Sequence, residues 1–524
     1  MVARAIVENP RIVFLPIIDH QIDDMTQQIF RFLSLPRELR DKIYRYAVIE
    51  PDGYHHDPTS GRLKTIRSTS PQLALIKTCK QVAEEMNGLA LQENIIIFKS
   101  YSDPSVSSYA EEFDRLRRDR NSSFRTMLRW ASECITMEKL FYLRDRYPFH
   151  EPIRRLCEMD RSRRIEVLKA SSIPYPARMW EHFTDRAVEE LVIMISTDER
   201  FFNLTAKDYD EELRGAQRLF SHVDWDDDDD THVVSYGPNS QMRLIELKLQ
   251  PWDIPEPDML EEMDKLMPRI VWDSEDDSHS ESANLTHRSK FQTSSYFSGT
   301  SYTIQFLRSI KPETFRQLRR VVIEENHDSV GRVESHAYGL ISFCQENQNL
   351  KFDIQINIWH SIIKHAWTWG LESLSLNDIV SNLSDWLRAI SRLRGEGMPE
   401  GQCNFVFGGT EPSLLQRIWN DAKTVAALQE AILETPEEGP LPNHHFLLFG
   451  IAEDFHLLME QAIKRDLPIS FGPDLGDMWD PEQACYDLEH TFPHTYEWKG
   501  IIDLSYFELE KDVWDEVKSQ YWGW

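Results

Sequence analysis

Residues 34–47 constrain the fold of this chain most, because they carry both a helix start signal and a one-sided apolar pattern. Pro36 lacks a backbone N–H and has a fixed φ, so it suits the first turn of a helix and few later positions. Ser34 precedes it as a cap, and Glu38 places negative charge near the positive end of the helix dipole. The pattern predicts a short amphipathic helix. The apolar residues that recur at spacings of three and four are Leu35, Leu39, Ile43 and Tyr46 with Ala47.

A second helix and a strand are predicted after a polar break. Residues 94–98, which read Asn-Ile-Ile-Ile-Phe, are rich in β-branched and aromatic side chains and indicate the strand. The apolar stripe of the helix repeats at spacings of four and three, through Leu75, Cys79, Val82, Met86 and Leu89. Two environments are open to the stripe of the first helix. It either faces a partner or packs inside the protein against Leu75, Val82 and Met86.

These two segments together resemble a known family. The first, Leu35-Pro36-x-Glu38-Leu39-x-x-x-Ile43-Tyr44, resembles the opening of an F-box. The second, residues 75–85 with Asn94 and Phe98 behind them, is similar to the F-box-like module of many filamentous-fungal proteins. The resemblance covers about residues 31–100, with residues 50–72 as an insertion between the helices. It implies that the module docks on the Skp1 adaptor of a ubiquitin ligase while a C-terminal domain recruits an unknown protein substrate. The residues implied in docking are Leu35, Pro36, Leu39, Ile43 and Tyr44.

The charge of the chain bears on its partners and its compartment. With 87 acidic and 58 basic residues, the formal net charge is −29. Such a surface repels nucleic-acid phosphate and anionic lipid, so we expect neither nucleic acid nor membrane as a partner. The six cysteines are scattered without a close pair, and no stretch approaches the roughly 18 consecutive apolar residues of a membrane span. These features predict an intracellular protein of the cytoplasm or nucleus.

The organisation expected from composition is α+β, with a small helical F-box-like module, then a mixed helix and strand region, then an α+β C-terminal domain. The length favours two or three domains over one core. The stretches are an N-terminal arm over 1–30, the F-box-like module over 31–100, the mixed region over 101–272, an acidic serine-rich disordered insertion over 273–300 and a tryptophan-rich C-terminal domain over 301–524.

Further elements follow from periodicity. Residues 351–359 alternate most cleanly, with Phe352, Ile354, Ile356 and Ile358 on one face, which is typical of a half-buried strand. The alternation of helix and strand after residue 301 suits an α/β or leucine-rich-repeat-like layer, although no fixed repeat period is present. Other strands are predicted at 189–195, 242–249 and 318–324, and helices at about 376–393, 412–434, 453–466 and 508–520.

No arrangement of residues points to catalysis, a cofactor or a metal. The chain lacks a phosphate-binding G-x-x-x-x-G-K-[ST] loop and a G-x-S-x-G nucleophile turn. The glycines of residues 395–401 are out of register for a nucleotide loop and predict a flexible turn. His490 and His494 have the spacing of a zinc-binding helix, but Pro493 opposes a helix there. The terminal Trp522 and Trp524 are candidates for a docking contact.

Three functional hypotheses result. The resemblance implies a substrate adaptor of a Skp1-containing ubiquitin ligase, which is a protein-interaction role and not an enzyme. A structural or interaction protein that keeps the helices only as a core element is the alternative. An enzyme of unrecognised type is the least favoured of the three. Exposure of Leu39 and Ile43 separates the first two, because a docking face must lie on the surface.

Overall fold

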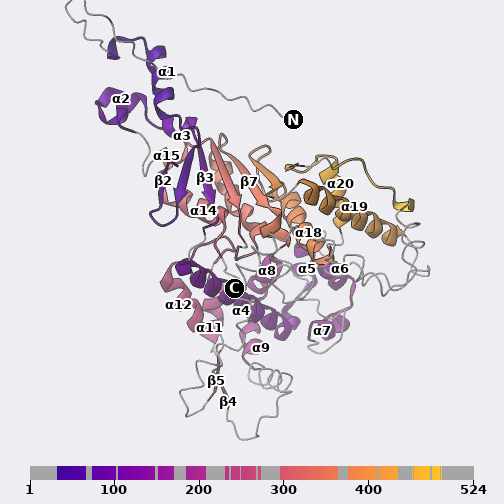
Figure 1. Cartoon of the computed structure of the whole chain (residues 1–524). Helices are drawn as coiled ribbons and strands as arrows, with labels where there is room; N and C mark the ends of the chain where they lie inside the picture. Colours follow the sequence, from indigo (N-terminus) through magenta and orange to yellow (C-terminus); the bar gives the residue numbers. More distant parts are fainter. Residues whose placement is uncertain are drawn as a thin grey trace, which may run out of the picture.

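A mixed α/β structure, shown in Figure 1, is formed by the described part of the chain. The computed structural model describes residues 32–66, 73–101, 104–147, 151–169, 185–207, 231–234, 238–247, 249–266, 269–272, 296–327, 329–363, 376–409, 412–434, 451, 454–472, 475–483 and 486. Several sequence-based expectations lie outside these residues, namely the arm over 1–30, most of the insertion over 273–300, the histidines at 490 and 494, the helix over 508–520 and the terminal tryptophans.

A seven-stranded sheet is the centre of the fold. Its strands lie in the order β2-β1-β3-β6-β7-β8-β9, and all neighbours are parallel except β1 and β2. The strands are β1 Tyr54–Asp57, β2 Arg62–Lys64, β3 Ile95–Lys99, β6 Arg320–Glu325, β7 Lys351–Asn357, β8 Cys403–Gly408 and β9 Ile469–Phe471. The sheet therefore joins the region expected to be a separate helical module to the C-terminal region. The mixture of helices and strands is confirmed, but the mostly parallel order is of the α/β kind, not α+β.

The helices of the C-terminal region cover one face of this sheet. Strands β3, β6, β7, β8 and β9 are neighbours in chain order, and right-handed crossovers between strands in that order place all connecting helices on the same side. The burial of alternate residues agrees, since Phe352, Ile354 and Ile356 of β7 are buried. The covering elements are α14 Gly299–Ser309, α15 Pro312–Phe315, η4 Val333–Leu340, α16 Ile341–Glu346, the short π-helical turn η5 Trp359–Ile363, α18 Leu376–Leu393, α19 Pro412–Glu434 and α20 Phe455–Ile463.

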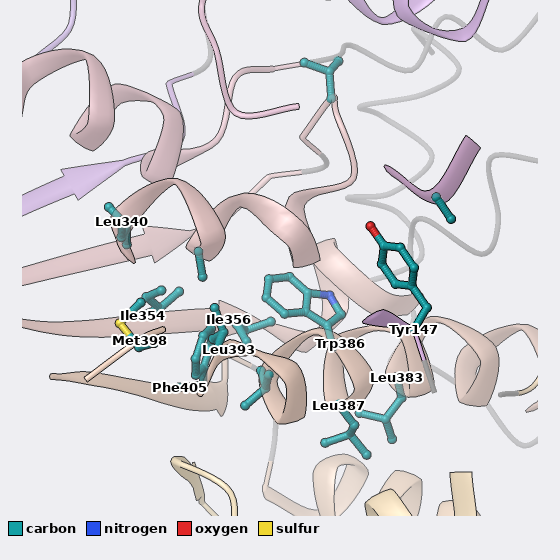
Figure 2. Close-up of a cluster of buried hydrophobic side chains, with 14 of the residues drawn as sticks. Tyr147, Leu340, Ile354, Ile356, Leu383, Trp386, Leu387, Leu393, Met398 and Phe405 are labelled. Atoms are coloured by element: carbon teal, nitrogen blue, oxygen red, sulfur yellow. The ribbon is translucent and has the colours of Figure 1, made fainter. Parts of the chain in front are cut away.

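The hydrophobic core lies between the sheet and these helices, as Figure 2 shows for the part beneath α18. Trp386 and Leu387 of α18 are buried in the same core as Phe405 of β8. Phe407 of β8 makes edge-on ring contacts with Trp386 and with Trp419 of α19, at centroid distances of 6.3 and 5.9 Å. These two tryptophans therefore serve core packing, a common environment for large aromatic side chains.

Among the residues that the structure describes, no helix of the C-terminal region covers the second face of the sheet, which we call the open sheet face. On β7 its side chains alternate with the buried ones, and Lys351 and Gln355 are exposed. The charged residues of the open sheet face are the basic Arg62, Lys64, Lys99, Arg320 and Lys351 and the acidic Asp57, Glu324 and Asp353. The uncharged ones include His55, Ile95, Ile97, Val322, Gln355, Asn357, Asn404, Val406 and Ser470.

Residues 32–50 and 73–93 form a small helical unit at one end of the sheet, and Figure 1 shows α1 and α2 projecting from that end. Its buried centre is a separate hydrophobic cluster of Tyr44, Val48, Val82 and Met86. The elements are η1 Phe32–Ser34, α1 Arg37–Val48, η2 Leu75–Lys77, α2 Lys80–Glu85 and α3 Leu89–Glu93. The single helix predicted through residues 75–89 is wrong, because Gly88 takes a left-handed φ of +76° and separates α2 from α3.

The middle region is mainly helical. The strands predicted at 189–195 and 242–249 are wrong, since residues 189–195 belong to α8 and residues 242–246 to α11. In α8 the buried Val188, Val192 and Ile195 recur at helical spacing and lie on one helix face, whereas Ile193 is exposed. The elements of the middle region are α4 Pro104–Trp130, η3 Ser132–Cys134, α5 Met137–Arg146, α6 Glu151–Glu158, α7 Arg161–Lys169, α8 Asp185–Ile195, α9 Phe201–Lys207, α11 Pro238–Glu246 and α12 Pro257–Leu266. A two-stranded ribbon of β4 Thr231–Val234 and β5 Arg269–Trp272 accompanies them.

The order of the C-terminal elements was largely predictable. The strands at 318–324 and 351–359 are confirmed as β6 and β7, and the helix over 412–434 is α19. The end of the insertion predicted over 273–300 is wrong for residues 296–300, because Tyr296 pairs with Ser329 and Ser298 caps α14. Residues 395–401 form the predicted turn.

Candidate interaction surface

Helix α1 has an apolar outer face and an inner face that includes an arginine. Arg40, Tyr44 and Val48, spaced by four residues, are buried. The residues between them point outward, and Leu39 is 46% exposed, Ile43 39% and Tyr46 83%. Since a surface helix ordinarily turns its apolar stripe to the core, this orientation is the reverse of the usual one. We call the exposed apolar residues Leu33, Leu39, Ile43, Tyr46 and Ile49 the α1 outer face.

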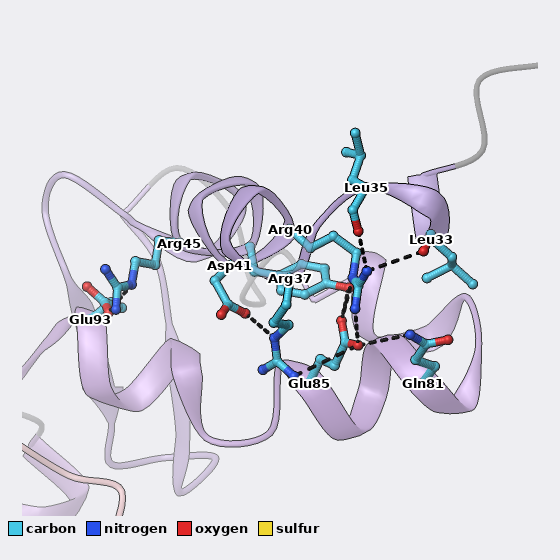
Figure 3. A network of polar contacts seen from close by, with 10 residues as sticks. Leu33, Leu35, Arg37, Arg40, Asp41, Arg45, Gln81, Glu85 and Glu93 are labelled. Atoms are coloured by element: carbon cyan, nitrogen blue, oxygen red, sulfur yellow. Dashed lines mark hydrogen bonds and ion pairs between the residues drawn. The ribbon is translucent and has the colours of Figure 1, made fainter.

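A polar network holds α1 in this orientation, as Figure 3 shows. The guanidinium of Arg40 donates to both carboxylate oxygens of Glu85 on α2, from Nε at 3.0 Å and from Nη2 at 2.7 Å. Its Nη1 donates to the backbone oxygens of Leu35 at 2.5 Å and Leu33 at 3.2 Å. The hydroxyl of Tyr44 donates to Glu85 Oε2 at 2.7 Å. One arginine thereby fixes both the following helix and the chain that precedes α1.

The electrostatics of this network favour its charged form. The hydrogen bond from Arg40, followed by those from Gln81 and Tyr44, lowers the pKa of Glu85 to about 2. A bidentate arginine–carboxylate pair is among the stronger polar contacts, and its planar geometry also sets direction. Asn94 supports the other end of α1, because its amide donates to the backbone oxygen of Val48 at 2.7 Å. Contacts with Glu85 and Asn94 therefore fix the orientation of α1 and of its outer face.

The structure separates the five residues predicted to dock a partner. Leu39, Ile43 and Pro36 are exposed, and Leu35 is partly buried. Tyr44 is corrected: it is 0% exposed and belongs to the inner cluster with Val82 and Met86. The alternative packing of the whole stripe against α2 is wrong for Leu39 and Ile43. Sequence reasoning missed Arg40, which periodicity assigns to the charged face, because nothing local signals its partner 45 residues away.

A second polar cluster is buried where β6 ends. The carboxylate of Glu325 accepts hydrogen bonds from the backbone N–H groups of Gly299 and Thr300, both at 2.9 Å, and from the Thr300 hydroxyl at 2.7 Å. Burial raises the pKa of Glu325 above its ordinary value. The side chain ties the start of α14 to the end of the central strand.

His336 completes this cluster. Its Nε2 lies 3.1 Å from the backbone oxygen of Gly331, which can only accept, so Nε2 carries the proton and Nδ1 accepts from the Ser298 hydroxyl at 2.7 Å. Burial lowers the pKa of His336 to about 3, so the imidazole is neutral. A serine that donates to a neutral histidine is the arrangement of an activated nucleophile, but Ser298 is 0% exposed. Because both side chains are buried, a substrate cannot reach Ser298, and the pair contributes to the packing of the interior.

The carboxyl end of strand β6 is covered by the middle region. Ligands of open α/β sheets bind beyond the carboxyl ends of strands. Here a Cβ on Gly331, whose φ is +89°, would overlap the backbone of Pro251, and one on Gly339 would meet the ring of Trp252 at 2.7 Å. The segment that carries Pro251 and Trp252 therefore packs directly on the loops that follow β6. The position beyond the carboxyl end of β6 is therefore filled by the chain itself.

Comparison with known proteins provides no assignment, since no family model, no curated protein and no solved structure matches this chain. Within the described ranges, no three histidine, cysteine, aspartate or glutamate side chains are placed to hold a metal ion. Among the same residues, no helix has both the length and the apolar character needed to cross a bilayer. The α1 outer face is therefore the surface on which a functional proposal rests.

Proposed function

We propose that this protein is a non-catalytic interaction protein, and that it serves as a substrate adaptor by docking the α1 outer face on a Skp1-type subunit of a ubiquitin ligase. The observation that carries the proposal is the exposure of Leu39, Ile43 and Tyr46 on a helix whose opposite face is anchored. Exposed apolar residues grouped on one element mark interaction sites more often than isolated ones do.

The support beneath the face adds to this argument. A partner that binds a flexible segment must order it, which weakens binding. Here Arg40 and Tyr44 hold α1 against α2 through Glu85, so the helix is already in place before docking. Figure 1 shows α1 at the end of the sheet away from the middle region. The order of the motifs in residues 35–44 and 75–98, which resembles an F-box-like module, gives the partner class.

The test is co-purification of the full chain with a Skp1-type adaptor. We expect the wild type to bind and the Leu39→Asp, Ile43→Asp double variant to lose binding by at least about a hundredfold, because central apolar contacts dominate such interfaces. A matched control is Leu433→Asp, Leu457→Asp, which replaces two exposed leucines on α19 and α20 and should bind as the wild type does.

Two results would contradict the proposal. If the wild type does not bind, α1 to α3 are only a core element of a structural or interaction protein. If the control pair loses binding equally, the effect comes from added negative charge and not from the α1 outer face. Hydrogen exchange across residues 37–48 shows whether each variant keeps the helix, so that loss of docking is separated from unfolding.

A further inference from the structure

The open sheet face differs in charge from the rest of the chain. It carries five basic side chains and three acidic ones, whereas the whole chain has 58 basic and 87 acidic residues. The side chains on a solvated sheet face can be uncharged or carry charges of both signs without effect on the core. The folding of the sheet therefore does not require this excess of basic side chains.

The acidic residues of the face are already paired with basic neighbours. Asp57 lies 2.5 Å from Lys64 Nζ, and Glu324 lies 2.9 Å from Lys99 Nζ. Asp353 is 3.9 Å from a guanidinium nitrogen of Arg320, a looser contact. Arg62 and Lys351 have no ion-pair partner among the residues the structure describes. The face therefore presents surplus positive charge, and its carboxylates offer little to an incoming cation.

Part of this surplus lies at the amino end of the inner strands β6 and β7, whereas Arg62 lies on the outermost strand β2. Arg320 and Lys351 are register partners on β6 and β7, at the amino ends of both strands. The Arg320 side chain is 59% exposed, and Lys351 is exposed as well. Two cations on adjacent strands are separated by about 5 Å of sheet, which suits two carboxylates of one chain segment.

Side-chain hydrogen bonds link the strands beside this pair. The amide of Asn404 donates to Asp353 Oδ1 at 3.4 Å, and the hydroxyl of Ser470 donates to Asn404 Oδ1 at 3.2 Å. These bonds link β7, β8 and β9 across the face, next to the half-buried Val322 and Val406. A sheet surface on which apolar and polar side chains alternate suits a protein segment, because protein interfaces combine the two kinds of contact.

We propose that the open sheet face binds an acidic segment of a protein partner, with carboxylates of that segment on Arg320 and Lys351. A long polyanion such as a nucleic acid is repelled by the net charge of −29. A short acidic segment contacts only the part of the face that carries Arg320 and Lys351. The pair lies at the same end of the sheet as α1 to α3, since Gln92 of α3 donates to Gln317, but it includes no residue of the α1 outer face. The inference therefore goes beyond the adaptor function and does not depend on it.

The test measures binding of a fluorescein-labelled peptide of alternating glutamate and glycine to the full chain at low salt, by anisotropy. We expect Arg320→Glu, Lys351→Glu to weaken binding at least about tenfold, since each reversal turns an attraction into a repulsion. The neutral pair Arg320→Gln, Lys351→Gln should give an intermediate loss. The control Arg118→Glu, Lys265→Glu makes the same change in net charge at two exposed sites on α4 and α12, and should bind within twofold of the wild type.

Four outcomes would overturn the inference. The wild type fails to bind the peptide, or the control pair weakens binding as much as the open-face pair. A labelled oligothymidylate of equal length binds at least as tightly, which would assign the face to phosphate. Sedimentation shows a dimer that the Arg320→Glu, Lys351→Glu variant dissolves, which would assign the face to a second copy of this chain.

Discussion

Alanine substitution on the two faces of α1 provides the sharpest test of the orientation of this helix. Full burial of a leucine side chain stabilises a protein by about 1.5–3 kcal/mol. Leu39 is 46% exposed, so just over half of that burial is lost in Leu39→Ala, or about 1 kcal/mol, with no cavity left behind. Tyr44 is 0% exposed, and truncation of a buried aromatic residue costs about 3–5 kcal/mol.

The assay is hydrogen exchange of residues 37–48 in the full chain, which reports the opening of α1 without requiring two-state unfolding of the whole protein. A difference of about 2 kcal/mol or more corresponds to at least about thirtyfold faster exchange in Tyr44→Ala than in Leu39→Ala. Met86→Ala, which truncates another buried member of the same cluster, should resemble Tyr44→Ala. Equal exchange in Leu39→Ala and Tyr44→Ala would refute the outward orientation of Leu39.

Three further predictions concern pH and a single glycine. The pKa of Glu85 falls from 4.5 to about 2 on folding, so the stability that its carboxylate gives to the protein is complete above pH 4.5 and is lost as the pH falls toward 2. Hydrogen exchange of α1, corrected for intrinsic rates, should show this acid-dependent change in the wild type and not in Glu85→Gln. Burial lowers the pKa of His56 from 6.5 to about 4, so the unfolded state binds the proton first and the stability of the protein falls as the pH drops from 6.5 to 4. In urea unfolding followed by tryptophan fluorescence, His56→Phe should show a smaller fall than the wild type. The same pH profile in both proteins would contradict this prediction. Gly88→Ala should destabilise α2 and α3 by about 1–2 kcal/mol, because φ is +76° and the new Cβ meets the Gln317 side chain. In thermal unfolding, this variant should lose more stability than Gly61→Ala, where φ is +62° and the new Cβ meets no other atom.

What could be predicted from the sequence follows the range of the interactions. Alternation along residues 351–359 identified β7, because this signal lies within the strand itself, and the helix predicted over 412–434 is α19. The buried face of α1 was predicted wrongly for Tyr44 and Arg40, since Glu85 selects that face from another helix. The apolar stripe on α1 was visible, but whether it faces a core or a surface is a tertiary property.

The arrangement of the sheet was beyond sequence reasoning for the same reason. Strand β3 pairs with β6, and the middle region lies between them in the chain. Local patterns identify strands at 95–98 and 318–324 but contain no signal that these two become neighbours. The buried cluster of Ser298, Glu325 and His336 depends on that pairing, so it could not be foreseen either.

The pairing of β3 with β6 also has a consequence during synthesis. Lys99 and Arg320 are separated by 221 positions (320 − 99), and at about 5–20 residues per second the ribosome needs roughly 10–45 s to deliver the second strand after the first. During that interval one edge of β3, with the apolar run Ile95 to Phe98, has no strand to pair with. A nascent chain that stops before residue 325 presents this edge to other chains. Expression of the N-terminal half alone is therefore expected to aggregate, and a fragment that extends past β6 is the shortest one in which β3 is paired on both sides.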